Sequence, residues 1–354
     1  MQYHNTEKLN FCTFCGFKIS DTKTTPCSNC SFSTDEKRLV VPNKAFIFAS
    51  LYGNNGWRQW VACSLGIVLI WQFIGVLPLV TVCGMLNYLG LQEYACKTDS
   101  LSITGPSHVP GFSLSILPFV IGLIGMFYLL KWIHGKRLIN CLTGRKKLDF
   151  GRVLFAMLVV AFMSSISLLI EFNSETGASA QAEITRNPVN MNFLFLSMVA
   201  LLLVPIQAGL EEVFFRGYIL QGISLISKSR IFLILCTSVI FTVVHLANPE
   251  PWEYGVTTYA VTIFMLGIFM GLITLLDGGL ELAIGFHTMN NLWSFLIVGL
   301  ETSVISTPAL FILSIEKLDL ISTVIPGIIQ FMLLTAIFAW RYGWFARSKA
   351  RQTY

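Results

Sequence analysis

Long apolar runs leave few folds open to this chain. Crossing the hydrocarbon core of a bilayer takes about 20 residues of helix, and a backbone inside lipid must satisfy its own hydrogen bonds. Only 12% of the residues are charged, whereas soluble domains carry about 25%. The sequence therefore predicts an all-α polytopic membrane protein with about eight transmembrane helices, at 60–82, 112–133, 153–172, 192–210 with its continuation, 231–246, 258–276, 280–299 and 322–340.

The other segments divide the chain into parts. The segment 303–315 is apolar but short and contains Pro308, so we interpret it as interfacial or re-entrant. No secretory signal peptide is expected, because the first apolar stretch begins near Trp57. The expected parts are a zinc-ribbon module at 1–38, a linker at 39–56, two accessory transmembrane helices with a basic cytoplasmic loop at 57–150, a core at 151–345 and a basic cytoplasmic tail at 346–354.

The N-terminal module carries Cys12, Cys15, Cys27 and Cys30 in the pattern C-x2-C-x11-C-x2-C. Each C-x2-C pair can turn two thiolates onto one ion, and four thiolates make a closed tetrahedral zinc site. We predict a structural zinc ion that supplies the folding energy of a module with no other visible core. Two disulfides or a redox pair are the alternatives. The five remaining cysteines form no usable pattern.

The module resembles the zinc ribbons at the N-termini of prokaryotic membrane proteins. It is too weakly basic to predict nucleic-acid binding. We expect it either to recruit a cytosolic partner or to cap the cytoplasmic face.

Lysine and arginine set the expected orientation, because cytoplasmic loops of membrane proteins are enriched in both. With eight alternating spans, most basic residues fall on one side and most acidic loop residues on the other. Both termini are then cytoplasmic, where a reducing environment keeps thiolates available for zinc. The basic residues on this side are Lys136, Arg137, Arg145, Lys146, Lys147, Arg152, Lys228, Arg230, Arg341, Arg347, Lys349 and Arg351.

Several polar side chains lie inside the apolar runs, where ionisable groups are rare and usually functional. Glu212 and Arg216 are four residues apart and can pair on one helix face, which lowers the cost of burying either. Glu211 is turned by about 100° from its neighbour and can face a cavity. The candidate set, drawn from three predicted helices, is Glu211, Glu212, Arg216, His245, His287 and Asn291.

This set suits the hydrolysis of a peptide bond. A carboxylate removed from water is a stronger base, and a nearby imidazole can share a water molecule or pass a proton to the leaving amine. His287 and Asn291, four residues apart, can donate two hydrogen bonds to one oxyanion. Each element alone has a plainer interpretation: a helix clamp, a transport relay or a packed histidine. The three elements together favour catalysis.

The same residues carry a resemblance to a known family. GLEEVFFRG (209–217), FTVVH (241–245) and HTMNN (287–291) are similar, in order and approximate separation, to the EExxxR, FxxxH and HxxxN motifs of the CPBP family. This family comprises CAAX proteases and bacteriocin-processing enzymes and is also called the Abi family. The resemblance covers roughly 153–340, so we interpret 151–345 as a CPBP-like intramembrane protease core.

The resemblance implies an intramembrane glutamate-dependent endopeptidase. In it, Glu211 and His245 activate water, and His287 and Asn291 form the oxyanion hole. The second glutamate and the arginine of the first motif support the site. A catalytic metal is arguable, because Glu211, His245 and His287 could share an ion if they converge tightly; we favour catalysis without one.

The expected substrate is a membrane-associated or exported peptide or protein. Eukaryotic relatives cleave prenylated CaaX proteins, but the ribbon looks prokaryotic, so we expect a multi-pass protein of a prokaryotic plasma membrane and other substrates. One alternative is a non-catalytic scaffold or bacteriocin-immunity protein that binds another membrane protein. Another is a proton-coupled transporter, although the sequence shows no inverted repeat. Expected partners are the substrate and the lipid bilayer, and no nucleic acid.

Overall fold

The computed structural model describes all residues except 1–45, 52, 92, 98–101, 174–182 and 346–354. The predicted zinc ribbon, with Cys12, Cys15, Cys27 and Cys30, lies outside the described residues, as does the predicted basic tail. Both therefore stay predictions.

The described chain is mostly helical, as predicted, and all eight predicted spans are helices. Six helical segments are long and apolar enough to cross a membrane: Trp57–Tyr88, His108–His134, Phe150–Phe172, Met191–Ile223, Val256–Asp277 and Leu320–Tyr342. The other two, α10 (Arg230–His245) and α13 (Glu281–Leu296), have 16 residues each. The chain is thus a multi-pass membrane protein, and the count of eight spans is not confirmed.

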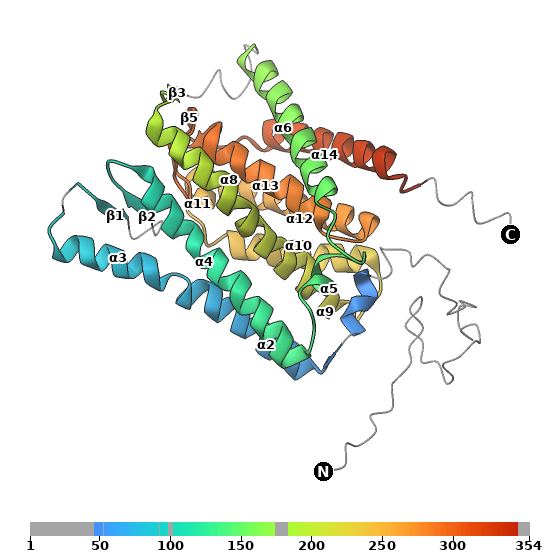
Figure 1. The fold of residues 1–354 in the computed structure, drawn as a ribbon. Coiled ribbons are helices and arrows are strands. Elements are labelled where there is room, and N and C mark those ends of the chain that lie inside the picture. Colours follow the sequence, from blue (N-terminus) through green and yellow to red (C-terminus); the bar gives the residue numbers. More distant parts are fainter. Residues whose placement is uncertain (1–45, 52, 92, 98–101, 174–182, 346–354) are drawn as a thin grey trace, which may run out of the picture.

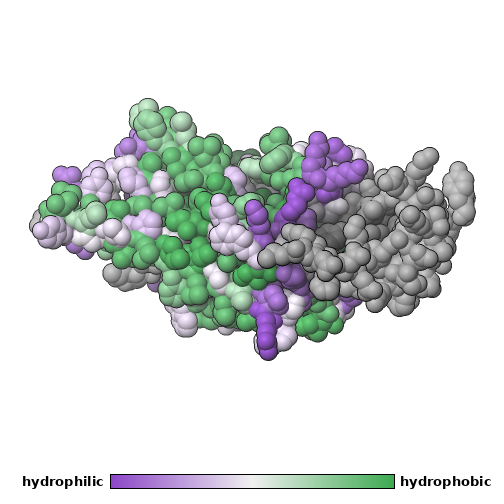
Figure 2. All heavy atoms as spheres, turned by 60° about the horizontal axis from the view of Figure 1, so that its bottom comes forward, coloured by the Kyte–Doolittle hydropathy of each residue, from purple (hydrophilic) through white to green (hydrophobic). Residues whose placement is uncertain are grey.

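The helices pack into one bundle (Figure 1). The first helical segment consists of α2 (Trp57–Leu69), η2 (Ile70–Ile74) and α3 (Leu77–Tyr88), and it lies along α4 (His108–Leu129) and its extension η3 (Leu130–His134). Next come α8 (Met191–Glu212) beside α4, α13 beside α8, and α6 (Phe150–Phe172) beside α13. Helix α12 (Val256–Asp277) packs between α10 and α14 (Leu320–Tyr342). Apolar side chains cover most of the described face in Figure 2, between paler or polar ends.

The fourth span extends well beyond Glu211. The sequence predicts this span at 192–210 with a continuation of unstated length, and it places Glu211 near the cytosolic end. In the structure α8 continues through η4 (Val213–Ile219) and α9 (Leu220–Ile223), giving 33 residues in all. Twelve residues, or about 18 Å of helix at 1.5 Å per residue, therefore follow Glu211. The predicted continuation is present, and Glu211 lies farther from the end of the helical segment than the sequence suggested.

Small sheets close one end of the bundle. Strand β3 (Glu183–Arg186) pairs antiparallel with β5 (Phe311–Ser314), and β4 (Val298–Leu300) pairs parallel with β5. A second sheet pairs β1 (Ala95–Lys97) with β2 (Ser102–Thr104). The segment 303–315, interpreted as interfacial or re-entrant, thus contributes the central strand of the three-stranded sheet. Its alternation was too short to predict a strand from the sequence.

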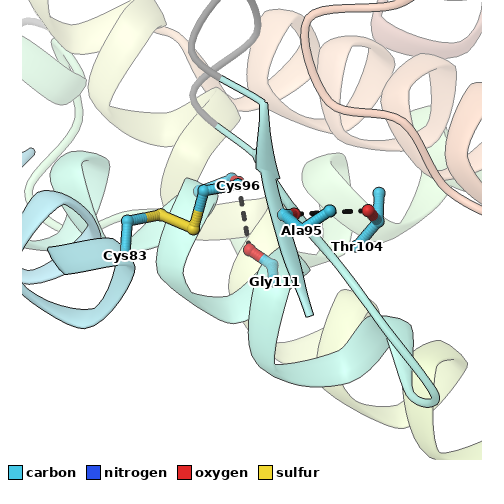
Figure 3. The surroundings of a disulfide bond; sticks show 6 residues. Cys83, Ala95, Cys96, Thr104 and Gly111 are labelled. Atoms are coloured by element: carbon cyan, nitrogen blue, oxygen red, sulfur yellow. Dashed lines mark hydrogen bonds between the residues drawn. A yellow bond between two sulfur atoms is a disulfide. The ribbon is translucent and has the colours of Figure 1, made fainter. Parts of the chain in front are cut away.

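Two of the five cysteines without a sequence pattern form a disulfide. Cys83 of α3 is bonded to Cys96 of β1 (Figure 3). Cys63, Cys141 and Cys236 are free. The disulfide lies in the connection between the first two predicted spans, which the charge distribution placed outside the cell, where disulfides persist.

The predicted linker at 39–56 is partly buried in the core. Its residues Phe46, Ala49 and Ser50 are at most 3% exposed, and η1 (Ala49–Leu51) forms a short helical turn. Backbone carbonyls of this stretch accept hydrogen bonds from buried side chains: Gln221 Nε2 donates to Phe46 O at 3.0 Å and Lys136 Nζ to Ser50 O at 3.0 Å. The linker prediction was therefore wrong for 46–51, which we call the docking segment.

Ion pairs join the helix ends at the predicted cytoplasmic side. Arg145 donates to Asp277 Oδ2 at 2.8 Å and to Glu281 Oε2 at 3.0 Å, and Arg152 pairs with Asp277 Oδ1. Asp277 ends α12 and Glu281 begins α13. These ion pairs therefore fix the first turn of α13. The same helix carries His287 six residues after its first residue.

Candidate active site

Glu211, His245 and His287 converge inside the bundle from α8, α10 and α13. Glu211 Oε2 lies 3.9 Å from His245 Nε2 and 3.8 Å from His287 Nε2. These separations are too long for direct hydrogen bonds. Glu211 Oε2 is buried without a hydrogen-bond partner among the described groups. One water molecule could contact the carboxylate and both imidazoles at once, as general-base catalysis requires.

Glu212 organises the site without facing the same side as Glu211. Its Oε1 accepts from Arg216 Nη1 at 3.0 Å and from His287 Nδ1 at 2.8 Å. Glu212 and Arg216 are fully buried, and their pairing offsets part of the large cost of removing two charges from water. The predicted i,i+4 pair is confirmed in the geometry, and its link to His287 is a contact that the sequence did not suggest.

The hydrogen bonds of both histidines decide which ring nitrogen carries a proton. His245 Nδ1 lies 2.7 Å from the Phe241 carbonyl oxygen, which can only accept, so Nδ1 carries the proton. The lone pair of Nε2 then faces Glu211. His287 Nδ1 likewise donates to Glu212. His287 can therefore donate through Nε2 only with both ring protons in place, a charge that two buried carboxylates against one guanidinium can balance.

Asn291 lies one turn after His287 on α13, and its amide faces α8. Its Nδ2 donates to Gln207 Oε1 at 3.4 Å. Gln207 is buried and lies one turn before Glu211, so the donor end of the Asn291 amide is turned toward the helix face that carries Glu211. The residues predicted for the oxyanion hole thus lie on the same side of α13.

The ring of Phe241 packs against the charged and imidazole groups of the site. The Arg216 guanidinium carbon lies 4.0 Å from the ring centroid, within the range of cation–π attraction. The His245 ring centroid lies 4.1 Å away and the His287 centroid 6.4 Å away. The aromatic residue of the second motif therefore packs against three members of the candidate set, a role that the sequence interpretation did not give it.

The helix widens where it carries Arg216. Residues Val213–Ile219 form the π-helix η4, whose hydrogen bonds span five residues instead of four. Such insertions are rare and often occur at functional sites. Gly217 lies in this turn, and a Cβ there would meet the Cys141 carbonyl oxygen at 2.5 Å. The absence of a side chain lets α5 (Ile139–Leu142) pack directly on η4.

The structure brings together the side chains of all six predicted site residues. Among the described residues, no group of three or more His, Cys, Asp or Glu side chains is arranged to hold a metal ion. Sequence reasoning missed Gln207 and the contacts of Phe241. A polar residue four positions before Glu211, inside an apolar run, was the available signal for Gln207.

Comparisons with known proteins find a match for the part of the chain that carries all six candidate residues. Residues 190–293 match the family model described as type II CAAX prenyl endopeptidase Rce1-like. The chain is 27% identical over 199 residues to the Uncharacterized protein YyaK of Bacillus subtilis (strain 168). That alignment covers 56% of this chain and 65% of the relative. No solved structure matches.

Proposed function

We propose that this chain, which carries an Rce1-like domain at residues 190–293, is an intramembrane endopeptidase. The family match points to a CAAX-type intramembrane protease activity. The observation that carries the proposal is the position of Glu211 Oε2, which lies within 3.9 Å of both His245 Nε2 and His287 Nε2. A carboxylate oxygen with two imidazole nitrogens around one point suits the activation of a single water molecule.

In the proposed reaction, Glu211 takes a proton from water and the water oxygen attacks the carbonyl carbon of the scissile bond. The carbonyl electron pair moves to oxygen, and the oxyanion accepts hydrogen bonds from Asn291 Nδ2 and the doubly protonated His287. The oxyanion electron pair then re-forms the carbonyl as the C–N bond breaks, and the amine nitrogen receives the proton from Glu211, directly or through His245. The products are a carboxylic acid, which keeps the second proton of the water, and an amine.

We infer a substrate with an apolar or lipid-like portion. His245 is the most accessible of the three converging side chains, with 21% of its side chain exposed against 7% for Glu211 and 6% for His287. Its helix presents large apolar side chains on its outer face, including Val239, Val243 and Val244. A segment approaching past His245 would therefore leave lipid, not water, as it reaches Glu211.

A comparison of cell peptides tests the proposal. Membrane and secreted peptides are quantified by mass spectrometry from cells that express the wild type, Glu211→Ala or Glu253→Ala, the last being an exposed carboxylate of α11 (Glu250–Tyr254). Uncleaved precursors should accumulate only with Glu211→Ala. Identical peptides from all three would reject proteolysis. A physiological effect that survives in Glu211→Ala/His245→Ala would instead favour a scaffold or immunity role.

We also propose that the reaction needs no metal ion and that zinc is structural, held by Cys12, Cys15, Cys27 and Cys30. Both parts follow from the sequence pattern and are testable by elemental analysis of the purified protein. One zinc per chain is expected. Zinc should be lost from Cys27→Ser/Cys30→Ser and retained in full by His245→Ala, and a loss of zinc in the histidine variant would contradict the metal-free reaction.

A further inference from the structure

Gln207 is a buried polar residue in contact with the site that lies outside the three motifs. It lies on α8, four residues before Glu211, and is 6% exposed. Its Oε1 accepts from Asn291 Nδ2 at 3.4 Å. The side chain thus reaches from the helix of the general base to the helix of the oxyanion donors.

An asparagine amide has a donor end and an acceptor end, and a half-turn about its last bond exchanges them. Only the NH2 end of Asn291 can stabilise an oxyanion, because the carbonyl end would place a second partial negative charge against it. A fixed acceptor near one amide proton therefore determines whether the residue helps or opposes the reaction. Nothing in the HxxxN spacing itself supplies such an acceptor.

We infer that Gln207 is a positioning residue that holds the Asn291 amide with its NH2 end toward Glu211. One Nδ2 proton is directed to Gln207 Oε1, which leaves the second free for the substrate oxygen. The catalytic consequence rests on the proposed endopeptidase function, whereas the amide orientation does not. Gln207 is expected to touch neither the water nor the scissile carbonyl.

Nuclear magnetic resonance tests the orientation without any turnover. Side-chain amides of asparagine are labelled with 15N in the purified full chain, and the Asn291 signal is identified by its loss in Asn291→Ala. In the wild type, one Asn291 amide proton should exchange slowly with water. Gln207→Met, which has similar length but no acceptor, should abolish this protection, and Gln207→Glu, which keeps an acceptor, should retain it. Unchanged protection in Gln207→Met would overturn the inference.

Kinetics test the consequence, with a quenched fluorescent peptide built on the precursor that Glu211→Ala accumulates. Loss of one oxyanion donor typically lowers kcat about 100- to 1000-fold, so Asn291→Ala should fall in that range. Gln207→Met should lower kcat at least about 10-fold with KM unchanged, and should add less than about 2-fold in an Asn291→Ala background, because residues acting as a unit are not additive.

The control is Leu203→Met, which lies one turn earlier on the same helix and should leave kcat unchanged. Multiplicative losses in the double variant would show that Gln207 acts independently of Asn291, which contradicts the inference. If no precursor accumulates, the proposed function fails, and the amide-exchange measurement still decides the orientation. Should Gln207→Met not fold, Gln207→Leu supplies the same test.

Discussion

Glu212 and His287, 75 positions apart in the chain, share a 2.8 Å hydrogen bond between Oε1 and Nδ1 inside the helix bundle. The same oxygen accepts from Arg216. One carboxylate atom therefore neutralises a buried guanidinium and sets the ring of a histidine on another helix. The same contacts therefore contribute to the stability of the helix bundle and to the position of His287 in the site. Mutations can separate these two contributions.

The first prediction concerns this ion pair. Arg216→Met leaves the buried carboxylate without its cation and should lower the unfolding free energy by about 3–5 kcal/mol. Glu212→Gln/Arg216→Met removes both charges and should cost clearly less than the sum of the single variants. Thermal unfolding in detergent measures each. Strict additivity would show that the pair does not interact.

The second prediction uses the Cys83–Cys96 disulfide, whose cysteines are 13 positions apart. Closing a loop of about 15 residues is worth about 3 kcal/mol in the chain-entropy account, so Cys83→Ser/Cys96→Ser should lower the unfolding free energy by about that amount. A reductant should lower the unfolding free energy of the wild type by the same amount and should leave that of the double variant unchanged.

The same bond tests the proposed orientation. In intact cells, a membrane-impermeant reductant followed by an impermeant maleimide should label the wild type at Cys83 and Cys96. The double serine variant provides the control and should stay unlabelled. Labelling that appears only after the cells are opened would place this end in the cytosol and reverse the predicted topology.

The third prediction concerns pH and Lys136. Burial lowers the pKa of Lys136 from 10.5 to about 8, and the thiols of Cys141 and Cys63 partly offset the shift. Between these pH values the unfolded chain holds a proton that the folded chain lacks, so the unfolding free energy rises with pH. Burial also raises the pKa of Cys141 to about 12, which acts in the opposite direction above pH 9.

Measurement therefore belongs between pH 8 and 9. The wild type should gain about 1 kcal/mol of unfolding free energy over this unit relative to Lys136→Met, since a full proton difference is worth 1.36 kcal/mol per pH unit. Groups shared by the two proteins cancel in the comparison. Parallel pH profiles would show that Lys136 keeps an ordinary pKa.

The fourth prediction distinguishes the N-terminal module from the docking segment. Removing residues 1–45 leaves Phe46 and Ser50 in place, so the thermal midpoint should change little. Removing residues 1–51 takes the Ser50 carbonyl from Lys136 Nζ and leaves Gln221 Nε2 with Asn140 O as its remaining carbonyl partner. Each buried donor left unsatisfied costs about 1–3 kcal/mol. Thermal unfolding of both truncations, with peptide cleavage as the second readout, tests this. Equal stability of the two would reject the docking role of 46–51.

The sequence allowed the fold class and the candidate set to be predicted, because both depend on local patterns. Apolar length predicts a membrane helix, and the spacing of Glu212 and Arg216 predicts a shared face. The convergence of Glu211 with His245 and His287 could only be expected through a resemblance, since spacing within a helix says nothing about neighbours from other helices.

The missed features share a physical cause, which is that they depend on contacts that no local pattern reveals. Cys83 and Cys96 are only 13 positions apart, but one lies in an apolar helix and the other in a short strand, and only the fold brings them within bonding distance. The burial of Phe46 and Ser50 depends on Gln221 and Lys136, more than 80 positions away. Strand β5 pairs with β3, which lies more than 100 positions earlier in the chain, and its four residues are too few to give a periodic signal.

The π-helical turn at Val213–Ile219 has a consequence for sequence change. A turn with one surplus residue keeps Glu212 and Arg216 paired, while Gln221, farther along, reaches Phe46 of the docking segment. Loss of a residue between Glu212 and Arg216 would shorten their spacing from four positions to three and turn the arginine by about 100° about the helix axis. Homologues should therefore tolerate substitution along this stretch far more readily than a change in its length.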